Sequence, residues 1–265
     1  MGNDIYNVPT VAELAAKGET AEVLFWVGCA GSYDEKYKRV TKMMVKLLNK
    51  AGVKFAVLGP EEACTGDPAR RAGNEFLFQM QAAANIQILN GYSIKKIVTA
   101  CPHCFNVLKN EYPELGGNYE VIHHSVLLRQ LIDEGRLKLE NAGQFKDRKI
   151  TYHDSCYLGR ANGIYDEPRE LLKTLEADLS EMKRSRTRGL CCGAGGAQMF
   201  KEPENGSKDI NTERSEEALK TGAKTIASAC PFCKTMLLDG VKHFNKEDEV
   251  DVKDLAELIG EAEGL

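Results

Sequence analysis

Two hydrophobic periods alternate along the chain. Short apolar runs at residues 22–27, 53–58 and 94–100 are typical of buried strands, and each precedes a segment with apolar residues at helical spacing. Residues 34–51, for example, carry one apolar face and are followed by Gly52, a common helix stop. Strands that alternate with helices favour a parallel sheet joined by right-handed crossovers.

The same order of elements restarts in the second half of the chain. The pattern predicts strands at residues 22–27, 53–58, 94–100 and 119–123, then at 149–153, 179–183, 224–229 and 249–252. It predicts helices at residues 34–51, 68–89, 101–111 and 125–134, then at 167–176 and 210–221, after 230 and at the C-terminus. An internal repeat of this kind indicates one supersecondary arrangement used twice.

We therefore predict an α/β protein of two pseudo-symmetric βα repeats with parallel sheets. Residues 1–21 form an N-terminal arm with a short helix around 11–16, residues 22–143 the first repeat, and residues 144–265 the second.

Eight of the nine cysteines occupy matching positions in the two repeats. Thirty-four residues separate Cys29 from Cys64, and the same number separates Cys156 from Cys191. Each cysteine is predicted to follow a strand end, so the thiols should gather at the carboxyl edge of each sheet, where open α/β folds place ligands.

The later cysteines repeat as well, with one difference. The turn Cys101-Pro102-His103-Cys104 aligns with Cys230-Pro231-Phe232-Cys233, and Cys64-Thr65-Gly66 aligns with Cys191-Cys192-Gly193. Thr65 stands where the second repeat has Cys192, so the two repeats should not hold identical sites.

The glycines after Cys192 favour a cradle for a bound group. Gly193, Gly195 and Gly196 allow a sharp turn that lets adjacent sulfurs converge and lets backbone N–H groups approach what they hold. They lack the spacing of a dinucleotide-binding loop.

Composition limits the classes of function. The 265 residues include 35 basic and 39 acidic residues, so no nucleic-acid-binding character is visible. No apolar run approaches the ~20 residues that span a bilayer, and no signal peptide is recognisable. We expect a cytoplasmic protein, in which nine cysteines indicate metal or redox chemistry rather than disulfides.

Each C-P-x-C turn has an electrostatic meaning. The first cysteine is expected at a helix N-cap with proline at the first helical position, so the positive helix end faces the sulfurs. This arrangement lowers thiol pKa values and stabilises an anionic cluster, but it also suits a redox dithiol.

Three kinds of site stay open on these grounds. A zinc ion fits the four cysteines Cys29, Cys64, Cys101 and Cys104. The second repeat has five cysteines, one more than a single zinc ion binds. A dithiol exchange enzyme has one C-x-x-C turn, which follows the first strand of its fold. This chain has two such turns, and each follows the third predicted strand of its repeat. Iron–sulfur ligation suits spaced cysteines in both repeats.

The duplicated pattern C-x34-C-C-G…C-P-x-C resembles the CCG cysteine-rich domain. That domain occurs in heterodisulfide reductase and its relatives, including iron–sulfur subunits of glycolate and lactate oxidases. The phrases at residues 64–75 and 229–233 are similar to the heterodisulfide-reductase-related iron–sulfur-binding proteins of bacteria.

The resemblance implies cofactors for both repeats. A noncubane 4Fe-4S cluster would be held, and catalysis carried through it, by the five cysteines of the second repeat: Cys156, Cys191, Cys192, Cys230 and Cys233. The first repeat would hold a 4Fe-4S cluster or zinc on its four cysteines.

The resemblance also implies an oxidoreductase subunit that receives electrons from a ferredoxin-type, flavoprotein or membrane haem or iron–sulfur partner and reduces a small disulfide. It would be peripheral to a membrane through that partner. One alternative is a pure electron-transfer subunit between a flavoprotein and a membrane quinone pathway, and a second is a zinc-stabilised scaffold.

Histidines near the cysteines have two readings each. His153 precedes Cys156 by three residues, and a structural role at a strand end is favoured over a bond to cluster sulfur or a proton relay. His123 and His124 are interpreted as capping residues or as residues that connect the two halves. His103 could tune the first site, although Phe232 holds the matching place.

Other side chains receive structural interpretations. Trp26 is expected to be buried beside the first site, and Met43, Met44 and Met80 to belong to the core. Arg70 and Arg71 fit either an anionic partner or a solvated helix face.

Overall fold

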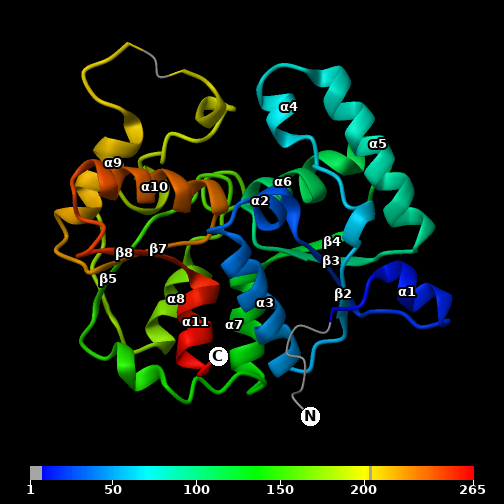
Figure 1. Ribbon diagram of the computed structural model, residues 1–265, viewed down its shortest axis with the longest axis horizontal. Helices are drawn as coiled ribbons and strands as arrows, with labels where there is room; N and C mark the ends of the chain where they lie inside the picture. Colours follow the sequence, from blue (N-terminus) through cyan, green and yellow to red (C-terminus); the bar gives the residue numbers. More distant parts are fainter. Residues whose placement is uncertain (1–7, 203–204) are drawn as a thin grey trace. The chain divides into compact units, whose positions relative to one another are not determined.

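The computed structural model describes residues 8–202 and 205–265 and divides into two units (Figure 1). The first unit ends at Lys138 and the second spans Leu139–Gly264. Of the predicted N-terminal arm, residues 1–7 lie outside the described residues. Helix α1 (Val11–Ala16) forms as predicted, with Thr10 and Glu13 as a capping box.

The first unit contains a four-stranded sheet of order β2-β1-β3-β4, with every neighbouring pair parallel. Its strands are β1 (Val23–Trp26), β2 (Phe55–Ala56), β3 (Lys96–Thr99) and β4 (Glu120–His123). All four residues of β1 are buried, as expected for a parallel strand covered on both faces.

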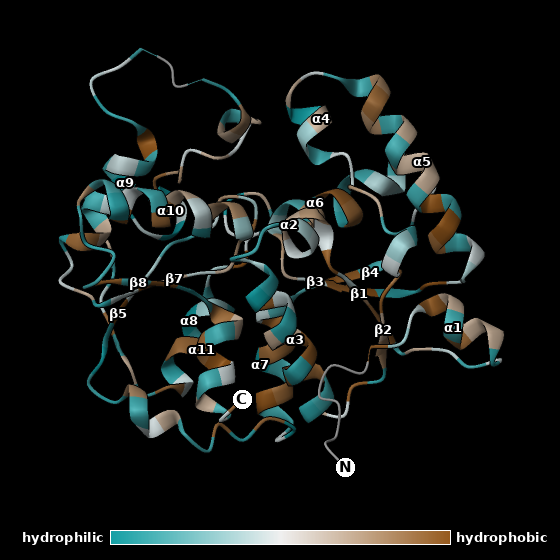
Figure 2. Cartoon of the chain, viewed as in Figure 1, coloured by the Kyte–Doolittle hydropathy of each residue, from teal (hydrophilic) through white to brown (hydrophobic). Residues whose placement is uncertain are grey.

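Helices cover both faces of this sheet. Figure 1 shows α3 (Lys38–Lys50) and α7 (His124–Asp133) on one face, and α5 (Glu75–Gly91) and α6 (Pro102–Asn106) on the other. In Figure 2 the strands of this sheet are coloured mainly as hydrophobic, which agrees with a core between the layers.

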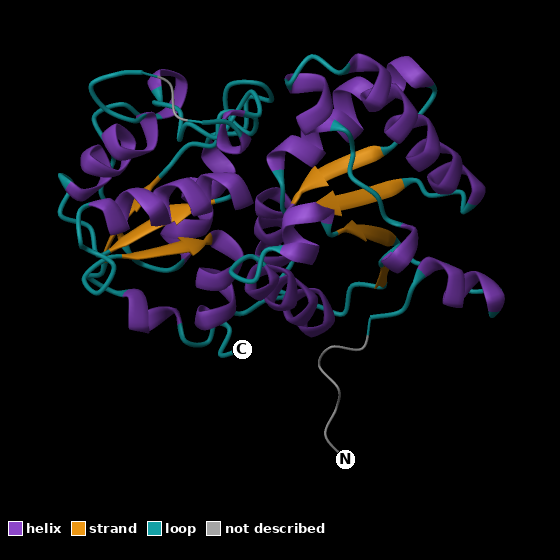
Figure 3. Cartoon of the chain, turned by 45° about the horizontal axis from the view of Figure 1, so that its top comes forward, coloured by secondary structure: helices purple, strands orange, loops and turns teal. Residues whose placement is uncertain are grey.

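The second unit repeats this plan. Its sheet has the order β6-β5-β7-β8, again parallel throughout, with β5 (Lys149–Tyr152), β6 (Asp178–Leu179), β7 (Thr225–Ser228) and β8 (Asp251–Asp254). Helices α9 (Ile210–Leu219) and α10 (Pro231–His243) cover one face, and α8 (Asp166–Thr174) and α11 (Leu255–Ala262) the other (Figure 1). Figure 3 shows the strands of both sheets. The predicted pseudo-symmetric α/β repeats are confirmed.

The helix predicted over residues 34–51 is observed as α3, which begins at Lys38. The Asp34 side chain accepts hydrogen bonds from the backbone N–H groups of Lys36 and Tyr37 at 2.8 and 2.9 Å and so caps the turn that leads into α3. The sequence did not predict the short helix α2 (Gly28–Tyr33), which lies before Asp34.

The helix predicted over residues 68–89 is divided. It consists of α4 (Asp67–Arg71) and α5, separated by Gly73 at φ +88°. Asn74 then starts α5, because its side chain accepts a hydrogen bond from the Leu77 N–H. The break allows α4 to lie directly after Cys64.

Not every cysteine lies close to the end of the preceding strand. Cys101 and Cys230 come directly after β3 and β7, whereas β2 and β6 are two residues long and Cys64 and Cys191 lie in loops beyond them. These loops return the thiols to the same edge of each sheet, as the next section describes.

Met80 is not a core residue. Its side chain is 55% exposed on α5, whereas Met44 on α3 is fully buried and Met43 is half-buried. The apolar spacing in this part of α5 marks an exposed face that also carries Phe76.

The two methionines form a matched pair for a stability test. We expect Met44→Ala to reduce the free energy of unfolding by about 2–5 kcal/mol, because it leaves a cavity in the core. Met80→Ala should change it by less than about 0.5 kcal/mol. Denaturant unfolding of both variants measures this; equal losses would contradict the assigned burial.

Candidate metal centres

Four cysteines of the first unit gather in one place. The thiols of Cys29 and Cys64 are in hydrogen-bonding contact, as are those of Cys101 and Cys104, and Cys104 also interacts electrostatically with Cys29 and Cys64. They come from α2, the loop before α4 and the turn that opens α6. The topology thus brings together every cysteine predicted for the first site.

Five cysteines of the second unit form a continuous series of contacts. Cys156 contacts Cys191, Cys191 contacts Cys192, Cys192 contacts Cys233, and Cys233 contacts Cys230. Cys192, Cys230 and Cys233 are buried, whereas Cys156 and Cys191 are half-buried. Apolar side chains of Met199, Phe232 and Met236 pack against the group.

At least one thiol in each group is poised to ionise. The hydrogen bond from Cys29 lowers the pKa of the Cys64 thiol to about 6, and the hydrogen bonds from Cys156 and Cys192 hold the pKa of Cys191 far below its usual range. The pKa values of Cys29 and Cys156 rise in turn, because the thiol that donates keeps its proton. Thiolate is the form that binds metal.

Two equivalent glycines stabilise these thiolates. Gly66 and Gly193 have φ values of +90° and +91°, and their backbone N–H groups lie 3.5 and 3.3 Å from the sulfurs of Cys64 and Cys191. Each N–H points back to the sulfur two residues earlier, and the chain then leaves this turn at a positive φ, which explains glycine here.

The other glycines differ in their surroundings. Gly28, at φ +76°, lies so near the first site that a methyl group on it would be 3.4 Å from the Cys104 sulfur. A methyl group on Gly195 or Gly196 would meet nothing within 4 Å, so their part in cofactor binding stays a prediction.

Thr65 takes the spatial place of the fifth thiol. Its buried hydroxyl lies 3.9 Å from the sulfur of Cys104, and in the second unit Cys192 makes the corresponding contact with Cys233. The alignment of Thr65 with Cys192 is therefore matched by their geometry.

Both C-P-x-C turns have the predicted capping geometry. Cys101 and Cys230 are N-caps of α6 and α10, each with proline at the start of the helix. Backbone N–H groups of His103 and Cys104 bond to Cys101, and with the Cys104 thiol they outweigh burial and lower its pKa.

A charged network borders the first site. His103 Nδ1 lies 2.8 Å from Asp67, which also binds Arg71 at 3.1 Å, and Arg70 and Arg71 both bind Glu111. These arginines are committed to carboxylates of their own unit, so neither of the two roles predicted for them describes them fully. Burial lowers the pKa of His103, but the bond to Asp67 and the charge on Cys101 outweigh this and raise it.

The structure confirms the predicted capping role for His123. Its side chain accepts a hydrogen bond from the Ser125 N–H at the start of α7, and His124 is buried beside it. Trp26 is fully buried, as predicted.

His153 lies at the second site. A ring nitrogen of His153 and the sulfurs of Cys192 and Cys233 are within 4.8 Å of one another, and all three side chains are buried. Its Nδ1 accepts a hydrogen bond of 2.9 Å from Arg214 Nε. Burial and the neighbouring arginine lower the pKa of His153 to about 3.

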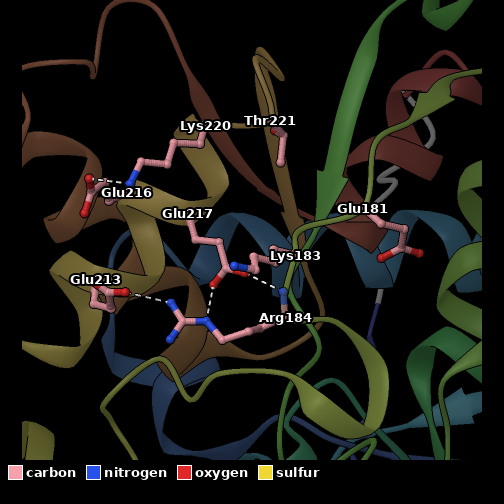
Figure 4. A pocket seen from close by; sticks show the side chains of 8 residues that line it. All are labelled: Glu181, Lys183, Arg184, Glu213, Glu216, Glu217, Lys220 and Thr221. Carbon is pink, nitrogen blue, oxygen red and sulfur yellow. Dashed lines mark hydrogen bonds and ion pairs between the residues drawn. The ribbon is translucent and has the colours of Figure 1, made fainter.

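Sequence analysis did not find Arg214. This residue of α9 is fully buried and also donates to the Arg184 carbonyl at 2.8 Å and to Glu217 at 3.2 Å. Figure 4 shows Arg184 between Glu213 and Glu217 and donating to both carboxylates. These bonds hold Glu217, the partner of Arg214, in place. No local sequence signal connects Arg214 to His153 and Arg184, which lie tens of residues away.

Two depressions in the second unit differ in kind. One of about 570 Å³ is lined by the residues of Figure 4, most of which pair with one another. The other, about 530 Å³, reaches Gly193, Met199 and Met236 and therefore adjoins the five cysteines. No cysteine is among the described residues that line the second depression, and the side chains of Met199 and Met236 pack between it and the thiol group.

The donor sets fit iron–sulfur clusters. A site made only of thiols suits soft metals, and five thiols exceed the four ligands of a structural zinc ion. His153 Nε2 is buried without a hydrogen-bond partner among the described residues, as expected beside a group that would accept its bond.

Comparison with known proteins agrees with the repeats. The cysteine-rich domain CCG matches residues 23–109 and 150–238. The chain is 46% identical over 94% of its length to "EtfAB:quinone oxidoreductase" of Syntrophomonas wolfei, of which it covers 35%. It is 47% identical over 96% of its length to "Probable iron-sulfur-binding oxidoreductase FadF" of Bacillus subtilis, of which it covers 36%.

A third relative is more distant. The chain is 36% identical over 93% of its length to a subunit of dihydromethanophenazine:CoB--CoM heterodisulfide reductase of Methanosarcina barkeri, and covers 60% of it. The chain thus spans between about a third and three fifths of these relatives. Among the described residues, no helix has the length and apolar character needed to cross a bilayer.

The two N–H-donating glycines allow a matched substitution. Both Gly66→Ala and Gly193→Ala should cost about 1–3 kcal/mol of backbone strain. Gly66→Ala should cost about 1–3 kcal/mol more, since its methyl group would lie 2.8 Å from the Phe78 ring, whereas the nearest atoms at Gly193 are 3.4 Å away. Denaturant unfolding checks the order, and a larger loss for Gly193→Ala would contradict it.

Proposed function

The chain belongs to the CCG cysteine-rich domain family, and we propose that it is the iron–sulfur module of an electron-transferring oxidoreductase. The observation that carries the proposal is the contact series of five thiols in the second unit, which adjoins a depression. When bound, an iron–sulfur cluster supplies one-electron transfer.

For the second unit we propose a noncubane 4Fe-4S cluster. A cubane cluster takes four thiolates, so a fifth thiol within the same contact series supports an arrangement in which cysteines bridge as well as cap irons. Cys156, Cys191, Cys192, Cys230 and Cys233 are its proposed ligands.

For the first unit we propose an ordinary 4Fe-4S cluster on Cys29, Cys64, Cys101 and Cys104. A threonine hydroxyl is a poor ligand for iron, so Thr65 leaves four donors. Zinc on the same four thiols is the alternative, since a closed tetrahedral site has that number of ligands.

The proposed route of electrons runs from a flavoprotein towards a quinone. The relatives named for quinone and iron–sulfur oxidoreduction are 46% and 47% identical to this chain, against 36% for the heterodisulfide reductase relative. The identities favour the electron-transfer role over disulfide reduction, the reverse of the order drawn from the sequence.

Disulfide reduction is the second candidate. The relative that is named as part of a heterodisulfide reductase supports it, as does the depression that reaches Gly193 and Met236 beside the cysteines. This reaction would add two electrons and two protons to a disulfide and release two thiols.

A reciprocal exchange at Thr65 and Cys192 tests the ligand assignment. Cys192→Thr, like Cys192→Ser, should abolish the second cluster's electron paramagnetic resonance and absorption signature and leave the first cluster's signals in place. Thr65→Cys should change only the first cluster's spectrum, because it restores the fifth thiol beside Cys104. Unchanged spectra in Cys192→Thr would rule out Cys192 as a ligand.

A reoxidation experiment separates the two candidate reactions. The anaerobically reduced protein is mixed with a soluble quinone or a small disulfide, and the recovery of visible absorbance is followed. The electron-transfer proposal predicts fast recovery with quinone and none above background with disulfide. Recovery with disulfide, with two thiols formed per disulfide consumed, would establish the second candidate instead.

A further inference from the structure

The fixed tautomer of His153 defines what this residue can do at the second site. Arginine has only hydrogen-bond donors, so the 2.9 Å contact with Arg214 Nε makes His153 Nδ1 an acceptor. The ring proton of a neutral imidazole must then be on Nε2. That nitrogen is buried and has no hydrogen-bond partner among the described residues.

The same argument excludes His153 as a metal ligand. Its position within 4.8 Å of the Cys192 and Cys233 sulfurs would suit a ligand. A ligating histidine normally donates its second ring N–H to an acceptor. Here the second nitrogen faces an arginine donor, so ligation through Nε2 would require an imidazolate.

Arg214 is held in the orientation that this requires. It is fully buried, and its Nη1 donates to the Arg184 carbonyl and to Glu217. Glu217 is fixed in turn by Arg184 Nε at 2.8 Å. The guanidinium therefore cannot turn away from His153 without losing buried hydrogen bonds.

The first repeat has a donor at the corresponding position. Trp26 precedes Cys29 by three residues, as His153 precedes Cys156. Its Nε1 is also buried without a hydrogen-bond partner among the described residues. An indole N–H donates and cannot ligate, so the property that both repeats share at this position is a ring N–H donor.

We propose that His153, fixed by Arg214 as the Nε2–H tautomer, donates a hydrogen bond to a cysteine sulfur of the second cluster and raises its reduction potential. The acceptor is the sulfur of Cys192 or Cys233, the two that lie near the ring. A hydrogen bond to a ligand sulfur withdraws charge from the cluster and favours its reduced state. The proposed iron–sulfur function is needed only to supply the cluster sulfur that accepts this hydrogen bond. The tautomer of His153 does not depend on it.

Two variants and a control test the donor role. His153→Leu removes the N–H and should shift the potential of the second cluster to more negative values, in an electron paramagnetic resonance redox titration. His153→Gln offers both an acceptor to Arg214 and an N–H donor, so its potential should lie near that of wild type. His243→Gln, at an exposed histidine of the same unit, is the control and should cause no shift.

The double variant His153→Leu/Arg214→Leu tests the same proposal if His153→Leu alone does not fold. It removes the buried guanidinium, whose Nε–H loses its acceptor in the single variant, while Glu217 keeps its bond to Arg184. Its second cluster should be retained with the same negative shift. An unchanged potential in a folded variant that lacks the N–H would overturn the proposal.

Nitrogen spectroscopy distinguishes a donor from a ligand. With ¹⁵N-labelled histidine, the reduced wild-type protein should show one weakly coupled nitrogen that persists in His243→Gln and disappears in His153→Leu. Strong coupling, as for a nitrogen bound to iron, would make His153 a ligand, and no coupling would make it structural. Either result would overturn the proposal.

The metal-free protein separates this inference from the proposed function. Long-range ¹H–¹⁵N correlation on labelled histidine should show the Nε2–H tautomer for His153. The Nδ1–H tautomer would overturn the donor assignment whatever the protein binds. Wild-type protein that takes up no iron would contradict the proposed function and remove the acceptor, even with the donor tautomer present.

Discussion

The mutual contact of cysteine thiols is the constraint on which this structure depends. Neighbouring thiols cannot all ionise, because each thiolate raises the pKa of the next, and most of these sulfurs are buried. The fold supplies partial compensation at fixed points: the glycine N–H groups at Cys64 and Cys191, and the helix starts at Cys101 and Cys230. A polycationic iron–sulfur core would supply the rest, which explains why so many thiols face one another.

The duplicated scaffold makes small differences between the repeats informative. Both repeats place a thiolate-stabilising glycine, a proline-started helix and a buried ring N–H at equivalent positions. They differ where Thr65 replaces a thiol. The first unit also adds the network of His103, Asp67 and Glu111, which surrounds its cysteines with fixed charges. The second unit instead adjoins a depression at Gly193. These differences suit an electron relay in the first unit and a site in the second unit that exchanges electrons with another molecule.

Much of the fold was readable from the sequence because parallel strands and amphipathic helices have distinct periods. The repeat indicated that both units use the same succession of strands and helices. The cysteine spacing indicated that the thiols gather at one edge of each sheet. Local periodicity failed at Gly73, where a backbone stop signal within an apolar pattern divides a helix, and it did not reveal the short helix α2 before Asp34. It also placed Met80 in the core, since periodicity marks an apolar face without showing whether anything covers it.

The site could be predicted only as far as sequence spacing reaches. The tautomer of His153 depends on Arg214, sixty-one positions away, and no local pattern connects them. The central claim, two iron–sulfur centres on nine thiols, is tested most directly by counting iron, zinc and acid-labile sulfide in anaerobically purified protein. The account predicts iron and sulfide in equal amounts, sufficient for two 4Fe-4S clusters per chain, with no zinc. Colourless protein that contains zinc and no labile sulfide would contradict it.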